Sequence, residues 1–162
     1  MDEILAALES INGTGSYYSE KKIRLDHLDI KIKKIGTIGL PITETNVKDL
    51  IGMAEPAKFG WKDQTIFDQD VRKVWEIPSS KVSIAKKLWS KSLDQLLNDI
   101  KNDLGLPKKS KLKAELHNLL IYEKGDFFKP HQDTEKLDNM VATLVIILPS
   151  NHEGGELIIN HC

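Results

Sequence analysis

The sequence is short of three features that mark large classes of protein. Its single cysteine, Cys162, cannot form an internal disulfide, which is compatible with a reducing compartment. No apolar run approaches the length of a membrane span. The first ten residues, MDEILAALES, carry acidic side chains where a signal peptide needs basic ones. We therefore expect an intracellular protein, cytoplasmic or nuclear, with no membrane partner.

An excess of charge of either sign is also absent. The 162 residues include 23 Lys and Arg and 24 Asp and Glu, which gives a formal net charge of -1. A chain without a strong field does not attract nucleic acid by charge alone, so we expect no nucleic-acid partner. Hydrophobic residues make up 40% of the chain, which is enough to bury the core of one domain.

Three segments carry the signals of helices. Residues 2–10 are predicted to form a short helix that ends at a glycine-rich breaker, so residues 1–15 are expected to be a helix and linker. A second helix is predicted at about 43–53, behind a threonine cap. The third, at about 83–104, has one apolar stripe and stops at a glycine followed closely by a proline.

Four segments are expected to contain strands outside the central part of the chain. Apolar residues at spacings of two or three predict short strands within 16–40, and one strand is predicted at 71–77. The run MVATLVIIL at 140–148 is continuous, apolar and rich in β-branched residues, which is typical of a fully buried strand. The segment ELIINH at 156–161 alternates and predicts a further strand.

The central stretch, residues 112–133, reads LKAELHNLLIYEKGDFFKPHQD. Its first half mostly alternates apolar and polar side chains, residues 123–126 are turn-formers, and an aromatic pair follows. This pattern predicts a hairpin. Because side chains two apart in a strand share a face, His131 and Asp133 on the returning strand are expected to converge. Such a pair suits a metal site, and the alternative is a polar loop at the end of a strand.

The features around His131 come in a particular order. A strand ends in Tyr122, then come a glycine turn, two phenylalanines, the His-x-Asp pair, a buried strand and the sequence GGEL at 154–157. This order, over about residues 116–160, resembles that of the iron(II) and 2-oxoglutarate-dependent dioxygenases of the prolyl 4-hydroxylase type. The preceding part, with DVRKVWEI and the helix up to residue 104, also looks like the region ahead of the catalytic barrel in eukaryotic members.

The resemblance implies a fold and a set of roles. The fold class would be α+β, a partial double-stranded β-helix (jelly roll) with supporting N-terminal helices. His131 and Asp133 match the first two iron ligands. Tyr122 matches the tyrosine that hydrogen-bonds 2-oxoglutarate, and its alternative is a plain core tyrosine. The cofactors implied are Fe(2+) and 2-oxoglutarate, with ascorbate as an optional addition, and the substrate would be a small-molecule or peptidyl carbon that becomes hydroxylated.

The chain departs from the family pattern after the pair. The family has a second histidine on a late strand and a basic residue beyond it, whereas this chain has no lysine or arginine after Lys136. His161 lies in a predicted strand but comes early for the distal ligand. Only about the first four of eight barrel strands can be counted. We therefore interpret residues 16–162 as the N-terminal part of a dioxygenase domain, truncated as given.

Two further functional alternatives remain open at this point. The first is a catalytically inactive fragment or interaction module that retains part of the barrel. The second is a zinc-dependent hydrolase, which would need a third ligand and a general base that the sequence does not identify. Two ligands without the third should bind iron weakly, so we expect little or no turnover of 2-oxoglutarate by this chain alone.

Overall fold

The computed structural model describes residues 15–23, 28–61 and 64–160. The chain divides into two compact units. The strand unit comprises residues 27–86 and 115–157, and the helix unit comprises residues 1–26, 87–114 and 158–162. The expected helix at 2–10 and the histidine at 161 lie outside the described residues.

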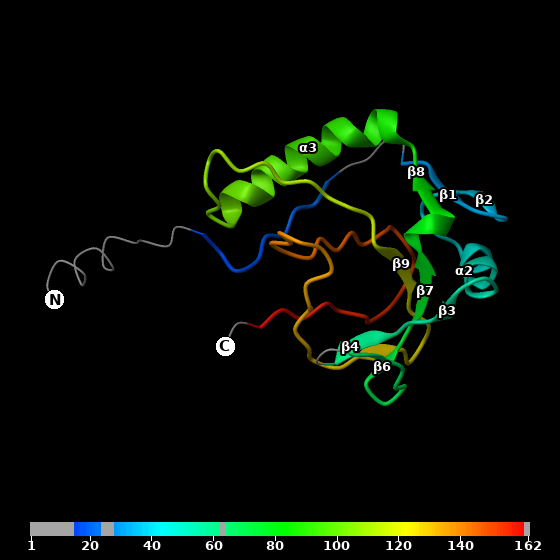
Figure 1. Cartoon of the computed structure of the whole chain (residues 1–162). Coiled ribbons are helices and arrows are strands. Elements are labelled where there is room, and N and C mark those ends of the chain that lie inside the picture. The colour runs from blue at the N-terminus through cyan, green and yellow to red at the C-terminus, as the bar shows by residue number, and fades with distance from the viewer. Residues whose placement is uncertain (1–14, 24–27, 62–63, 161–162) are drawn as a thin grey trace, which may run out of the picture. The chain divides into compact units, whose positions relative to one another are not determined.

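The strand unit is built from short antiparallel strands and one helix (Figure 1). In chain order its elements are β1 Ile30–Ile32, β2 Gly36–Ile38, α2 Glu44–Ile51, β3 Glu55–Pro56, β4 Phe59–Trp61, β5 Gln64–Ile66, β6 Arg72–Lys73, β7 Trp75–Pro78, the 3-10 turn η1 Ser79–Lys81, β8 Val82–Ile84, β9 Asn118–Ile121 and β10 Phe127–Phe128. They form sheets in the orders β2-β1-β8, β3-β7-β9, β10-β6 and β4-β5. The protein is therefore of the mixed α+β class, as expected.

The core of the strand unit lies between two of these sheets and α2. Its buried residues are Ile30, Ile32, Ile38, Leu50, Ile77 and Ile121. In β1 the isoleucines face this core while the lysine between them is exposed, which is the alternation that the sequence predicted. Helix α2 begins where expected, because Thr43 and Asn46 form a reciprocal capping box.

The helix unit is organised around α3, Lys86–Asp103. Trp89, Leu96 and Leu97 are its buried stripe. The predicted start of this helix was three residues too early, because residues 82–84 pair with β1 as strand β8 instead. Asp103, the last residue of α3, contacts the segment 16–21. The backbone N–H of Ser16 donates to the Asp103 carbonyl at 2.8 Å, and Lys21 Nζ lies 2.7 Å from Asp103 Oδ2.

The predicted hairpin at 112–133 is wrong. Strand β9 pairs with β7 and strand β10 pairs with β6, both antiparallel. Because β6 and β7 follow one another along the chain, β9 and β10 form one interrupted strand that runs in a single direction alongside them. A single residue, Val74, separates β6 from β7, whereas the five residues 122–126 separate β9 from β10. The turn-formers therefore make a loop that bulges out of a strand and do not reverse the chain.

The predicted strands at 140–148 and 156–161 are also wrong over their described residues. The structure shows irregular backbone there, with one parallel bridge between Ile42 and Ser150. Val141, Val145 and Ile147 are exposed, while Leu148 packs against the core of the strand unit. The apolar run meets no neighbouring strand within the described residues, so its backbone lacks the ladder that a strand requires.

Candidate metal centre

His131 and Asp133 lie side by side in the segment that follows β10. His131 Nε2 is 3.4 Å from Asp133 Oδ1, and both side chains are partly exposed to solvent. The structure therefore brings together the two residues that the spacing singled out, although they lie in irregular backbone and not on a hairpin strand.

The imidazole of His131 is oriented by two contacts. Its Nδ1 is 2.8 Å from the carbonyl oxygen of Lys129. A carbonyl oxygen can only accept, so Nδ1–H donates and Nε2 of the neutral ring carries the lone pair. The ring also stacks on Phe128, with centroids 3.5 Å apart and planes at 17°. These contacts leave Nε2 as the ring nitrogen that lies beside Asp133, in the way that a second-shell hydrogen bond orients a metal-binding histidine.

The carboxylate of Asp133 is oriented from the other side. The hydroxyl of Thr143 donates to Asp133 Oδ2 at 2.7 Å. The remaining oxygen, Oδ1, is the one that faces the imidazole. Thr143 is the hydroxyl residue within the apolar run 140–148, and that isolation was the signal by which the sequence could have indicated it. Hydrogen bonds at His131 Nδ1 and at Asp133 Oδ2 thus orient the two side chains, and Nε2 and Oδ1 are the atoms that face each other.

The donor set fits two positions of a metal centre. Two atoms bonded at about 2.1 Å to one ion, at a right angle, lie about 3 Å apart, and the pair needs little movement to reach that separation. An imidazole and a carboxylate also belong to the ligand set of non-haem iron(II). Within the described ranges, no group of three His, Cys, Asp or Glu side chains could hold a metal ion. His161, the later histidine considered above, lies outside those ranges.

Tyr122 comes directly after β9 and is 50% exposed. It is therefore not a core tyrosine. Partial burial raises the pKa of Tyr122 above the usual value, and the charge of Asp126 acts in the same direction. The charge of Arg72 and a hydrogen bond from it oppose this rise. These causes place the phenol beside a guanidinium and within the field of a carboxylate.

The loop at 122–126 is anchored to the strand that it bulges from. Trp75 Nε1 donates to Glu123 Oε2 at 2.8 Å, and Lys73 Nζ lies 3.1 Å from Asp126 Oδ1. Asp126 Oδ2 also accepts from the backbone N–H of Glu123 at 2.9 Å. Gly125 has φ of 82°, which a glycine adopts without strain. Contacts with both β6 and β7 therefore fix the position of Tyr122.

Arg72 is the residue of this region that the sequence analysis missed. It lies on β6 opposite Phe128, only 9% exposed, and its Cζ is 4.6 Å from the centroid of the Phe128 ring. Its Nη1 donates to the carbonyl of Lys58. The signal was present, because alternation along 71–77 puts Arg72 on the same face as the buried Val74. A basic residue on the buried face of a strand is rare enough to mark a site.

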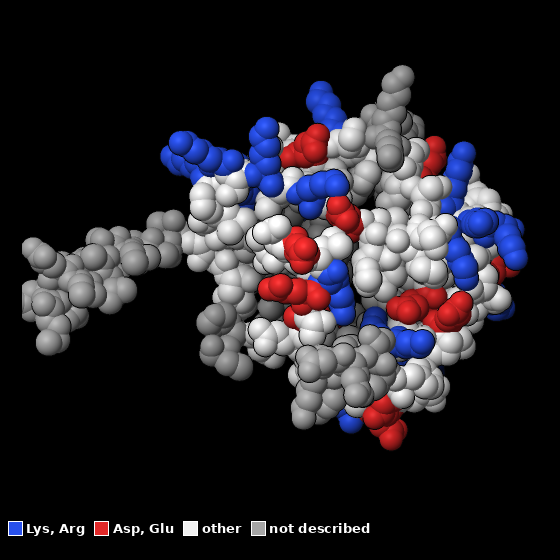
Figure 2. All heavy atoms as spheres, viewed as in Figure 1, with Lys and Arg blue, Asp and Glu red and all other residues white. Residues whose placement is uncertain are grey.

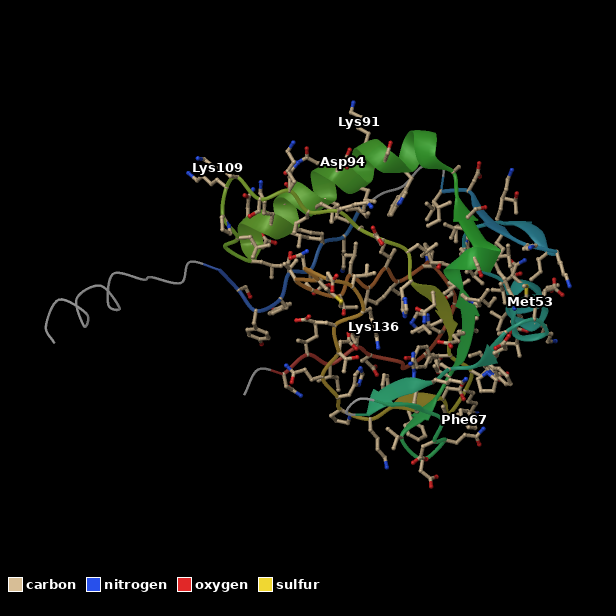
Figure 3. All side chains as sticks on the ribbon, in the orientation of Figure 1. Met53, Phe67, Lys91, Asp94, Lys109 and Lys136 are labelled. Carbon is tan, nitrogen blue, oxygen red and sulfur yellow. The ribbon has the colours of Figure 1, made fainter. Side chains whose placement is uncertain are left out.

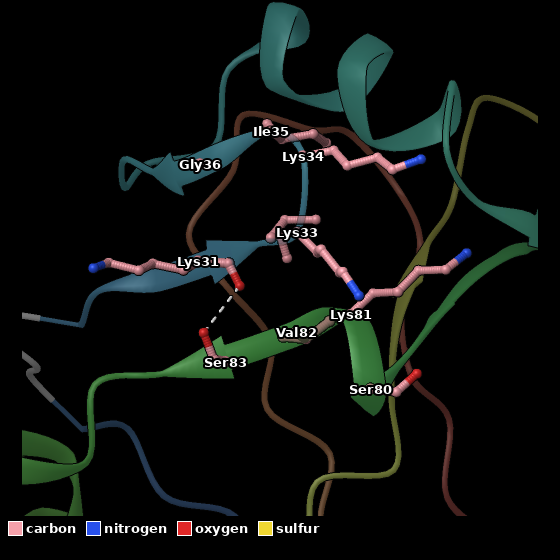
Figure 4. Close-up of a pocket in the computed structure, with 10 residues that line it drawn as sticks. Lys31, Lys33, Lys34, Ile35, Gly36, Ser80, Lys81, Val82 and Ser83 are labelled. Carbon is pink, nitrogen blue, oxygen red and sulfur yellow. Dashed lines mark hydrogen bonds between the residues drawn. The ribbon is translucent and has the colours of Figure 1, made fainter.

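A separate hollow of the strand unit lies between the β1–β2 turn and η1 (Figure 4). It has a volume of about 390 Å³, and Lys31, Lys33, Lys34 and Lys81 are among its lining residues. The amino groups of Lys31 and Lys34 point in opposite directions (Figure 4), and Lys81 pairs with Glu55 at 3.7 Å. Because these amines do not converge, the hollow lacks the geometry of an anion site.

The described residues on the face of the molecule drawn in Figure 2 show no concentration of charge of one sign. Acidic and basic side chains are interspersed over the face drawn in Figure 2, in keeping with the balanced composition. In the ranges that the structure describes, no helix has both the length and the apolar character needed to cross a membrane. Among the described residues, the pair at 131 and 133, with Phe128 stacked on its imidazole, is the group of side chains that most needs a functional explanation.

The comparisons with known proteins do not decide the family. No protein-family model matches the chain, and neither the curated proteins nor the solved structures give a match. The geometry of the strand unit and the order of residues in the sequence are therefore the observations that bear on function.

Proposed function

We propose that the chain carries part of the iron centre of a non-haem iron(II) and 2-oxoglutarate-dependent dioxygenase of the prolyl 4-hydroxylase type. The observation that supports this most is the pairing of His131 Nε2 with Asp133 Oδ1 at 3.4 Å. The opposite ends of the two groups are bonded to the Lys129 carbonyl and the Thr143 hydroxyl. A polar loop without a ligand has no need of this double orientation.

In this proposal each side chain has a defined task. His131 and Asp133 would hold the metal through Nε2 and Oδ1, and the Lys129 carbonyl would keep the imidazole in the tautomer that binds metal. Bound iron(II) would supply the chemistry by which dioxygen oxidises both partners, so that 2-oxoglutarate gives succinate and carbon dioxide and an aliphatic C–H of the substrate becomes C–OH. Phe128 would hold the imidazole ring in place by stacking, and Tyr122 would offer its hydroxyl to the cosubstrate.

The test is a metal titration under anaerobic conditions. Wild-type protein is titrated with Fe(2+), and with Mn(2+) as a paramagnetic probe, and compared with His131→Ala, Asp133→Ala and Thr143→Val. We expect each ligand substitution to weaken binding by at least about tenfold and Thr143→Val to weaken it less, because Thr143 only orients a ligand. His152→Ala is the matched control, since His152 is an exposed histidine whose contacts are with Ser150. Equal affinity in His131→Ala and His152→Ala would refute the proposed metal centre.

A second candidate function is an interaction module without catalysis. The exposed apolar side chains of Val141, Val145 and Ile147 favour it, because contiguous exposed apolar residues are typical of contact surfaces. The same titration separates the candidates. Metal binding that depends on His131 supports the iron centre, and release of succinate after 2-oxoglutarate and dioxygen are added to the metal-loaded protein supports the enzyme. If metal binding does not depend on His131, Asp133 or Thr143 in any variant, the result supports the interaction module.

A further inference from the structure

Two side chains lie against the ring of Phe128. The guanidinium Cζ of Arg72 is 4.6 Å from the ring centroid, and the imidazole centroid of His131 is 3.5 Å from it, with the two ring planes at 17°. An imidazole stacked at van der Waals distance covers its face of the ring, so a guanidinium has no room on that face. Arg72 and His131 therefore lie on opposite faces, and Phe128 is the middle layer of a three-layer stack.

The guanidinium layer of this stack is fixed by backbone contacts. Strand pairing sets Arg72 opposite Phe128 in the ladder between β6 and β10. Nη1 of Arg72 donates to the carbonyl of Lys58, which lies in the connection between β3 and β4. The ladder and this carbonyl thus hold the two ends of the Arg72 side chain, and its plane behind the ring is defined.

The same ladder also fixes the hydrogen bond of the imidazole. The backbone N–H of Lys129 donates to the Val71 carbonyl at 3.0 Å, which continues the pairing of β6 and β10 by one residue beyond Phe128. The carbonyl of Lys129 is the group that accepts from His131 Nδ1 at 2.8 Å. Both contacts of the imidazole therefore start from residues that β6 holds in place.

A guanidinium is a costly choice for the far face of an aromatic ring. In the described part of the chain, Nε of Arg72 and Oδ1 of Asp126 are both buried without a hydrogen-bond partner, although Lys73 Nζ lies 3.1 Å from that oxygen. The two opposite charges both affect the pKa of Tyr122, so they lie in one region and partly offset each other. Replacement of a buried ion by an apolar side chain of similar size is often neutral or stabilising. What the guanidinium adds to simple packing is a fixed plane and an attraction to the ring face.

We propose that Arg72 is a positioning residue for His131 and acts through the ring of Phe128. The guanidinium closes the far face of the ring, so the ring cannot withdraw from the imidazole. The imidazole in turn cannot tilt away from the orientation that places Nε2 beside Asp133. The effect on metal binding rests on the proposed function, whereas the orientation of the imidazole is a property of the metal-free protein.

The orientation is measured by NMR on metal-free protein with ¹³C-labelled histidine and phenylalanine. In the wild type, nuclear Overhauser contacts should join the Phe128 ring to the ring of His131 and to the side chain of Arg72. Arg72→Met supplies an unbranched apolar side chain without plane or charge. We expect it to lose the contact between Phe128 and His131 and the ring-current shift of the imidazole, while its urea midpoint stays close to that of the wild type.

A titration with Mn(2+) adds a functional measurement on the same variants. Arg72→Met should weaken binding by about threefold to tenfold, less than loss of a ligand, because Arg72 acts through a second side chain. Arg72→Lys should give a smaller loss, since an ammonium keeps the attraction to the ring face but not the planar shape. Lys136→Met is the matched control and should change neither measurement. Lys136 is an exposed cation of the segment that follows the pair, and its Nζ donates to the Thr134 hydroxyl at 2.9 Å (Figure 3).

An unchanged contact between Phe128 and His131 in Arg72→Met overturns the positioning role, and so does an equal loss of that contact in Lys136→Met. If Arg72→Met does not fold, Arg72→Lys carries the test, and an unchanged contact and imidazole shift in that variant overturn the role. The metal centre fails separately. A wild type that keeps the stack but binds no metal refutes the metal centre alone, whereas metal binding that depends on His131 and is equal in Arg72→Met refutes the positioning role alone.

Discussion

Strand β7 (WEIP) and the run 140–148 (MVATLVIIL) both carry isoleucine, yet their isoleucines differ sharply in exposure. Ile77 in β7 is 0% exposed, and Ile147 in the run is 70% exposed. Strand β7 has β3 on one side and β9 on the other, whereas the run has no strand neighbour among the described residues. Apolar side chains give a segment a reason to be buried, but a strand forms only where another strand accepts its backbone hydrogen bonds.

The largest effect that sharpens this comparison comes from truncating the same residue type in both places. Ile77→Ala leaves a cavity in the centre of the core and should cost about 2–5 kcal/mol of unfolding free energy. Ile147→Ala removes atoms that already contact water and should change it by less than about 0.5 kcal/mol. Urea denaturation followed by far-UV circular dichroism measures both. Equal costs would mean that the run is packed in solution, and the contrast would fail.

The same contrast explains which elements the sequence could predict. Helix α2 is specified locally, because its cap, its apolar stripe and its end all lie within a few residues of one another. The alternation of Ile30, Lys31 and Ile32 likewise identifies β1. The hairpin failed because residues 123–126 have the composition of a turn, and only the distant pairing with β6 and β7 determines that the chain continues in the same direction after them.

The candidate site divides along the same line. His131 and Asp133 could be found because their spacing of two residues is local. Arg72 and Thr143 each stand out locally, but no short motif encodes the contacts of Arg72 with Phe128 and of Thr143 with Asp133, so the sequence could not connect them to the pair. The strand pairing that brings β6 alongside β10 is what places Arg72 against Phe128.

The next effect concerns the loop that interrupts the strand beside β7. Asp126→Ala removes the acceptor of the Glu123 backbone N–H and the partner of Lys73. We expect a loss of about 1–2 kcal/mol, mostly from the unsatisfied N–H, because the ion pair reaches solvent on the lysine side. Asp126→Asn keeps an acceptor and should cost less, and Lys124→Ala serves as a control within the same loop. Denaturation midpoints measure all three, and equal losses in Asp126→Asn and Asp126→Ala would show that the hydrogen bond is unimportant.

A smaller effect is the response of this loop to alkaline pH. The folded protein holds the pKa of Tyr122 above its usual value, chiefly through burial. A raised pKa means that the folded state keeps its proton when the unfolded state has lost it. Stability from this source is therefore full below about pH 10, the ordinary tyrosine value, and is lost as pH rises through the pKa of the folded state.

Two variants, Arg72→Gln and Asp126→Asn, should shift the pKa of Tyr122 in opposite directions. The guanidinium favours the phenolate, so its removal should raise the pKa of Tyr122 further. Asp126→Asn should lower that pKa, because it removes a negative charge that disfavours the phenolate. The ultraviolet absorbance of tyrosinate, with Tyr122→Phe as the subtraction control, follows the titration. Shifts of the same sign in the two variants would contradict the arrangement of charges around the phenol.

The smallest change in stability is expected for Ile147→Lys, which tests directly whether the run 140–148 is exposed while β7 is buried. The run MVATLVIIL has no charged residue, and Val145 and Ile147 are exposed. If the exposure holds in solution, Ile147→Lys should move the unfolding free energy by less than about 0.5 kcal/mol. It should also reduce light scattering on concentration, because a charge within an apolar β-prone segment opposes association. Ile77→Lys, in contrast, should unfold the strand unit. A loss of stability in Ile147→Lys that approaches the loss in Ile77→Lys would mean that the run is buried, either within the chain or against a second copy. If that loss depends on protein concentration, the partner is a second copy.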